Sequence, residues 1–150
     1  MYIRKFLYLI IACITFVGCS TGGYQSGDWM PSEGDNAKMG VRYLLGRGAV
    51  QNDQKAFYYF NRAAEDGDPL AQNELAYLYA AGKGTKQDYT QALNWYQKAA
   101  DHGLASAQYN LALMYLYGLG TPKNKTLALN WLQKSAAHGF EPAKQRLARS

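Results

Sequence analysis

The side chains best suited to acid–base or metal chemistry in this chain are two histidines, His102 and His138, which lie 36 residues apart. Each directly precedes a glycine, Gly103 or Gly139, of the kind that ends a helix. A histidine at that place can interact with the last carbonyl groups of the helix, and two histidines so far apart are poorly placed to share a metal ion. The sequence therefore predicts a structural role for both and no metal site.

Carboxylates are the second group that could do chemistry. Those of interest are Glu65, Asp66, Asp68, Glu74, Asp88 and Asp101, which we expect mostly at helix ends and in loops, as caps or solvated turns. From residue 19 onward the chain has neither the His-Glu-x-x-His pattern of zinc proteases nor the Gly-x-Ser-x-Gly pattern of hydrolases. Phosphate-binding glycine loops open a helix, whereas the Gly-x-Gly pairs here close one. These patterns indicate a protein that is not an enzyme and binds no cofactor.

Cysteine offers a covalent modification near the start of the chain. Arg4 and Lys5 precede an apolar run, residues 6–17, which is too short to span a bilayer but fits the core of a secretory signal peptide. The Phe-Val-Gly-Cys-Ser stretch at residues 16–20 resembles a bacterial lipobox, in which small residues precede the cysteine that receives lipid. Cys19 is therefore the predicted lipidation site, after a lipoprotein signal peptide at residues 1–18.

Two alternatives to lipid on Cys19 stay open. Ile-Ile-Ala-Cys, ending at Cys13, is a competing match, but cleavage there would leave only residues 6–12 as an apolar core. The other alternative is an ordinary signal peptide with an incidental cysteine. Cleavage before Cys19 would leave a single thiol, too few for an internal disulfide, and acylation would explain why that thiol needs no partner.

The resemblance to bacterial lipoproteins implies a place in the cell. Two or three acyl chains would anchor the protein stably, and Ser20 after the cysteine resembles the pattern of lipoproteins sent to the outer membrane, facing the periplasm. Residues 19–34, rich in glycine, serine and acidic residues, predict a flexible tether. Within the tether, Trp29, Met30 and Pro31 either pack on the first helix or touch lipid or a partner.

The charge of the chain argues against nucleic acid as a partner. Removal of Arg4 and Lys5 with the signal peptide lowers the formal net charge from +5 to +3. The remaining basic residues are scattered and form no dense run, as on a solvated surface.

The elements that position these residues repeat with a step of 36 residues. The matching columns include Gly46, Gly82 and Gly118, then Gly48, Gly84 and Gly120, then Ala56, Ala92 and Ala128, and Tyr43, Tyr79 and Tyr115. Within a unit, apolar residues recur at three- and four-residue spacings along two stretches separated by the glycines, which predicts two antiparallel helices. A period of this size is typical of a helical solenoid, in which each unit buries its apolar face against its neighbours.

Three sets of residues carry a resemblance to a known family: the Gly-x-Gly columns, the Ala-Gln-Tyr-Asn-Leu-Ala run at residues 107–112 and the Ala-Leu-Asn-Trp-Tyr-Gln-Lys-Ala-Ala run at 92–100. With them, residues 35–150 resemble a Sel1-like repeat protein, a relative of the tetratricopeptide repeats. The resemblance implies an all-α fold, a right-handed α/α superhelical solenoid used as a protein-binding scaffold. Its three helix pairs would lie at about 35–67, 68–103 and 104–139, with a C-terminal capping helix at 140–150.

The resemblance also implies where a partner would bind. If Leu75 and Tyr79 face the core, a step of about 100 degrees per residue places Asn73, Tyr77 and Ala80 on the opposite side of the same helix. The predicted groove residues are these three and their equivalents, namely Ala37, Val41, Leu44, Asn73, Tyr77, Ala80, Tyr109, Leu113 and Leu116. In tetratricopeptide-like superhelices this face is concave, and an apolar strip there suits a partner segment. The alternative is that helix curvature or the Trp29 segment covers it.

The function predicted from the sequence is that of a membrane-anchored envelope lipoprotein whose solenoid binds another protein, of unknown identity, as a scaffold or adaptor. An alternative is inhibition, because Sel1-like lipoproteins resemble the immunity partners of some secreted phospholipase toxins. In that case the partner would be a toxin blocked in the periplasm.

Overall fold

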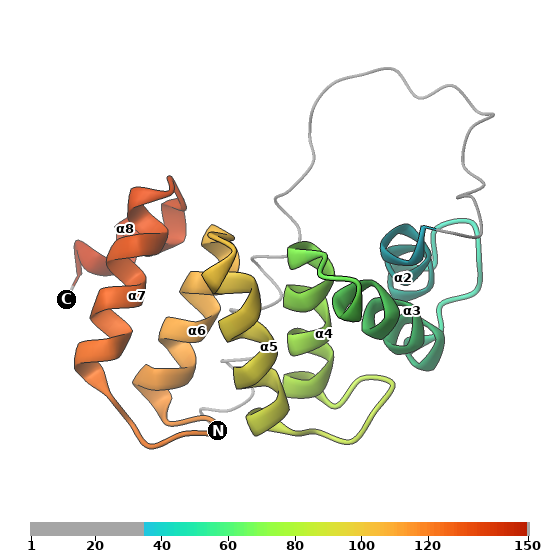
Figure 1. The fold of residues 1–150 in the computed structure, drawn as a ribbon, viewed down its shortest axis with the longest axis horizontal. Helices are drawn as coiled ribbons and strands as arrows, with labels where there is room; N and C mark the ends of the chain where they lie inside the picture. The colour runs from blue at the N-terminus through green and yellow to red at the C-terminus, as the bar shows by residue number, and fades with distance from the viewer. Residues whose placement is uncertain (1–34, 150) are drawn as a thin grey trace.

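The computed structural model describes residues 35–149, which form seven α-helices and no strand. The helices are α2 (Asn36–Leu45), α3 (Asp53–Glu65), α4 (Pro69–Ala81), α5 (Tyr89–Asp101), α6 (Ala105–Tyr117), α7 (Lys125–Ala137) and α8 (Glu141–Leu147). Each packs mainly on the helices before and after it in the sequence, and Figure 1 shows them following one another from α2 at the right to α8 at the left. The predicted all-α solenoid of three helix pairs with a final capping helix is confirmed.

Aspartate and asparagine side chains begin most of these helices. Oδ1 of Asp68 accepts hydrogen bonds from two backbone N–H groups of α4, at 2.8 and 3.2 Å. Oδ1 of Asp88 does the same for α5, at 2.9 and 3.0 Å. These bonds satisfy N–H groups that have no partner inside the helix, so both carboxylates are caps, as the sequence predicts.

In the second and third units, the second glycine of the Gly-x-Gly loop is explained by contact with the preceding unit. Gly84 has φ +69°, and a Cβ atom there would collide with the backbone carbonyl of Asp53, at the start of α3 in the preceding unit. A Cβ atom at Gly120 would likewise collide with the backbone carbonyl of Tyr89, at the start of α5. Gly48, in the first described unit, has φ +70° but a Cβ there would meet only an arginine side chain. The loops of the second and third units therefore pack on the unit before them, through a position that only glycine fits.

Small side chains let the two helices of a unit approach closely. The alanines of one column, Ala56, Ala92 and Ala128, are fully buried. Gly40 takes the place of Ala76 and Ala112 in the first unit because the Phe60 ring lies 2.8 Å from where its Cβ would be. These two buried columns of alanine and glycine are packing columns of the repeat, and they lie in the interior of the solenoid.

The ends of the described solenoid differ from its middle. Arg42 occupies the column in which Leu78 and Met114 are fully buried, and its Nη2 donates a hydrogen bond to the carbonyl of Gly48. At the other end, Ala143 of α8 is fully buried against the third unit. A short extra helix such as α8 closes the end of a solenoid.

Candidate functional site

The predicted lipidation site and its surroundings fall outside residues 35–149. Cys19, the competing Cys13 and the segment from Trp29 to Pro31 are therefore not placed by the structure. Within residues 35–149 no helix is long and apolar enough to cross a membrane.

The nine predicted groove residues lie on α2, α4 and α6, and they differ widely in exposure. Six are buried, two are half-buried and one is exposed: Leu44, Asn73, Tyr77, Ala80, Tyr109 and Leu113, then Ala37 and Leu116, then Val41. Their role in binding a partner stays a prediction. The burial decides which of them can be altered at the surface without disturbing the core.

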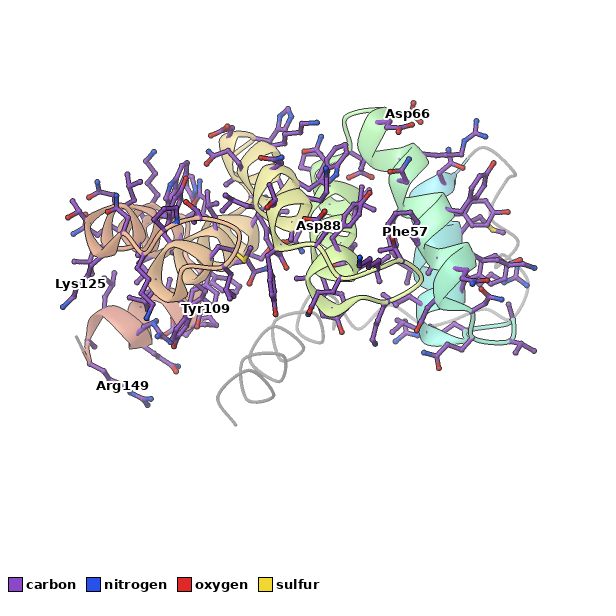
Figure 2. The ribbon with its side chains drawn as sticks, turned by 90° about the horizontal axis from the view of Figure 1, so that it is seen from below. Phe57, Asp66, Asp88, Tyr109, Lys125 and Arg149 are labelled. Carbon is purple, nitrogen blue, oxygen red and sulfur yellow. The ribbon has the colours of Figure 1, made fainter. Side chains whose placement is uncertain are left out.

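Tyr109 and Leu113 belong to the core around the last helix. They pack with Leu132 and Ala143, and the Tyr109 ring lies 5.4 Å from the Phe140 ring, centroid to centroid. Figure 2 shows Tyr109 on the side of the solenoid where α8 lies. The capping helix therefore covers part of the face that the repeat predicts as a groove.

A chain of buried polar side chains joins α4 to α6. Nδ2 of Asn110 donates to Oδ1 of Asn73 at 3.2 Å, and Nδ2 of Asn73 donates to Oε1 of Glu74 at 3.2 Å. Asn73 is 6% exposed and Asn110 is 4% exposed. Oε2 of Glu74 and Oδ1 of Asn110 are shielded from solvent and have no hydrogen-bond partner among residues 35–149. The network thus ends in two oxygen atoms that can still accept hydrogen bonds.

Burial raises the pKa of Glu74 to about 7, while the hydrogen bond from Asn73 acts in the opposite direction. The residue as a whole is half-buried, but its free oxygen is shielded, so the charged form loses much of its hydration. A carboxyl group in this setting changes its protonation near neutral pH. Among the residues that the structure describes, Glu74 has the largest shift in pKa.

Glu74 is the exception to the predicted placement of carboxylates at helix ends and loops, because it lies inside α4. A signal for this was present in the sequence. Residues 72–74 are three consecutive polar side chains, which together cover about 200 degrees of the helix circumference. A helix that packs on neighbours along much of its surface cannot turn all three towards solvent, and here all of them are buried or half-buried.

The two histidines directly follow α5 and α7, at the helix ends where the sequence predicts them. Nδ1 of His138 lies 2.9 Å from Oε1 of Gln108, and Nε2 of Gln108 donates to the carbonyl of Ala100 at 3.2 Å. The His138 side chain thus pairs with an amide of α6, the first helix of its own unit, rather than with the last carbonyls of α7. His102 is exposed. Within residues 35–149 no group of three or more histidine, cysteine, aspartate or glutamate side chains is placed to hold a metal ion.

A shallow hollow of about 460 Å³ runs along α3. Its lining residues are Phe57, Tyr58, Asn61, Arg62, Glu65 and Asp66. Arg62 donates from Nη1 to the hydroxyl of Tyr58 at 3.0 Å, so the one cation in the hollow is held by a neighbour on its own helix. Nothing in this arrangement resembles a catalytic site.

Comparison with known proteins gives concordant matches. A model of the Sel1 repeat matches residues 36–68, 69–104 and 105–140. Among solved structures, a Sel1 repeat protein from Oxalobacter formigenes is 43% identical, with a TM-score of 0.70 over 77% of this chain and 86% of that one. No relative is found among curated protein sequences.

Two further structures are similar. A protective antigen of uropathogenic Escherichia coli strains that displays an SLR fold is 30% identical, with a TM-score of 0.73 over 75% of this chain and 24% of that one. The cysteine rich protein B of Helicobacter pylori is 27% identical, with a TM-score of 0.63 over 68% of this chain and 76% of that one. This chain spans about a quarter of the Escherichia coli protein.

Proposed function

The chain belongs to the Sel1 repeat family, whose solenoids mediate protein–protein interaction, and from that premise we propose that it binds another protein at the bacterial envelope, held there by lipid on Cys19. The fold is typically that of a non-enzymatic scaffold. The observation that carries the proposal is the division of the 36-residue repeat into two sets of columns. The packing columns repeat from unit to unit, whereas the face of α2, α4 and α6 varies, as a surface selected for one partner would.

The anchor is supported by the basic start, the apolar run and the small residues before Cys19. We expect Cys19→Ala to release the protein from membranes and to abolish labelling with palmitate. Cys13→Ala is the matched control, because it alters the competing match and should leave both unchanged. Loss of label in Cys13→Ala alone would move the anchor to Cys13, and loss in neither variant would remove the lipid from the proposal.

Partner binding is tested by photo-crosslinking in intact cells. A crosslinking amino acid replaces either Val41 or Leu127. Val41 is 39% exposed on the proposed face of α2, α4 and α6, whereas Leu127 is 38% exposed on α7, the second helix of its pair. We expect a covalent adduct of defined mass from position 41 and none from position 127, because the two sites differ in face and not in exposure. Equal adducts from both, or adducts from neither, would overturn the assignment of the face.

Identifying the adduct separates the two roles that the sequence left open. If the crosslinked protein is an envelope protein that works equally well with and without this chain bound, the scaffold role is supported. A secreted phospholipase whose activity falls on binding would instead support the inhibitor.

A further inference from the structure

The two unpartnered oxygen atoms at the α4–α6 seam need an explanation. Buried polar groups in folded proteins nearly always have a hydrogen-bond partner, and one left without a partner lowers stability, the more so where the group is charged. Oε2 of Glu74 and Oδ1 of Asn110 are both in this state, at the two ends of one hydrogen-bonded chain. These two unsatisfied acceptors lower the stability of the free domain, and a ligand that donates hydrogen bonds to them would restore it.

The chemistry of these atoms defines the ligand. Both are acceptors, so the ligand must donate hydrogen bonds, and one belongs to a carboxylate, so a positive charge is favoured. Among side chains, the guanidinium of arginine has several N–H groups in a planar fork and can serve two acceptors at once.

The cations nearest in the repeat pattern are already held elsewhere. Lys38, one repeat before Glu74, and Arg146 of α8, two repeats after it, occupy the same column as Glu74. Lys38 is paired with Asp35 at 2.7 Å, and Arg146 donates to the hydroxyl of Tyr117 at 2.8 Å. Lys83 lies over the Tyr77 ring, 5.6 Å from its centroid. Among residues 35–149, burial and the hydrogen bond from Asn73 are what shift the pKa of Glu74, and no charged side chain of these residues contributes.

We propose that Glu74, Asn73 and Asn110 form a binding site for an arginine side chain of the partner protein. The inference rests on the proposed function and adds the chemistry of the partner. Asn73 positions Glu74 by donating to Oε1, and Asn110 supplies the second acceptor. Glu74 is half-buried, so part of its side chain is open to solvent, and the guanidinium approaches the carboxylate from that side.

Binding of labelled peptides tests the site on the chain as purified from cells. The probe is a fluorescein-labelled heptapeptide with one central arginine among leucine and alanine residues, and its control carries citrulline, which has the same shape without the charge. We expect the arginine peptide to bind about tenfold more tightly than the citrulline peptide, and Glu74→Gln to remove that preference. The same change at exposed Glu65 should leave the preference intact.

A second measurement needs no variant. In a ¹³C NMR titration of the glutamate carboxyl carbons, the arginine peptide should lower the pKa of Glu74, because a bound cation favours the carboxylate, and the citrulline peptide should not. Equal binding of the two peptides, or an unchanged Glu74 titration with bound arginine peptide, would overturn the site. If either result accompanies crosslinking from position 41, the proposed function stands and the arginine site falls.

Discussion

At the scale of single residues, Glu74 makes stability depend on pH. Its pKa is about 7 in the folded protein and near the usual 4.5 when unfolded, so between these values the folded state holds a proton that the unfolded state has lost. Stability contributed by this group is therefore full below about pH 4.5, falls as the pH rises to about 7 and stays low above it. The loss is on the order of 3 kcal/mol.

Urea unfolding at a series of pH values measures this effect. Wild type minus Glu74→Gln should show the decline between about pH 4.5 and 7, because the amide does not titrate. Glu141→Gln is the matched control, since Glu141 is exposed and paired only with Lys144. A flat difference between wild type and Glu74→Gln would mean that the carboxyl group is hydrated in the folded protein.

The residues of this site show what the sequence could and could not predict. Asn73 follows from the helical period as a member of the varied face, and it is part of the polar network. Its partner Asn110 lies on α6 in the next unit, and no pattern within one unit specifies which side chains of α4 and α6 meet. Burial of Glu74 depends on the same packing.

At the scale of elements, glycine serves two purposes that a pair of substitutions can separate. Gly84 and Gly48 have nearly the same positive φ, so alanine is strained at both by about 1–2 kcal/mol. Only at Gly84 would the added methyl group also strike the backbone of Asp53 in the preceding unit. We expect Gly84→Ala to lower the free energy of unfolding by about 2 kcal/mol more than Gly48→Ala does.

Chemical denaturation of the two variants, read by circular dichroism, gives this difference directly. Equal losses would show that the backbone conformation alone requires glycine and that the loop does not press on the neighbouring unit. Both chains should keep the wild-type helix content before unfolding, which guards against a comparison of misfolded protein.

The elements themselves are well specified by the local sequence. Asp68 and Asp88 cap their helices, and left-handed glycines end them, as the pattern predicts. The roles of residues at the ends of the stack could not be predicted from the sequence in the same way. Arg42 occupies a column filled elsewhere by leucine and methionine, and only the three-dimensional stack shows that it holds the following loop through Gly48.

At the scale of the whole molecule, the fold was predictable because a solenoid is nearly one-dimensional. Each helix packs on its sequence neighbours, so a repeated local pattern determines the architecture. Exposure of the varied face was not predictable in the same way. Val41, Tyr77 and Leu113 share one column, yet Val41 is 39% exposed whereas Tyr77 and Leu113 are 3% and 1% exposed. Burial of a side chain on that face depends on what the complete stack places over it.

The capping helix offers a test of that one-dimensional description. Ending the chain after Gly139 removes Phe140, Ala143 and the rest of α8, and exposes the apolar surface of Leu113 and Leu132. Each such side chain contributes about 1.5–3 kcal/mol when buried, so we expect a loss on the order of 4 kcal/mol in the free energy of unfolding. We also expect new binding of a hydrophobic dye.

Amide hydrogen exchange locates the loss. Because α8 packs chiefly on α7 and on the end of the third unit, protection should fall in α6 and α7 and change little in α2 and α3. An equal fall of protection in every helix would mean that the stack unfolds as a single cooperative unit. In that case, a ligand bound at Glu74 would also stabilise both ends of the solenoid. The truncation therefore shows how many helices would gain protection when a ligand binds there.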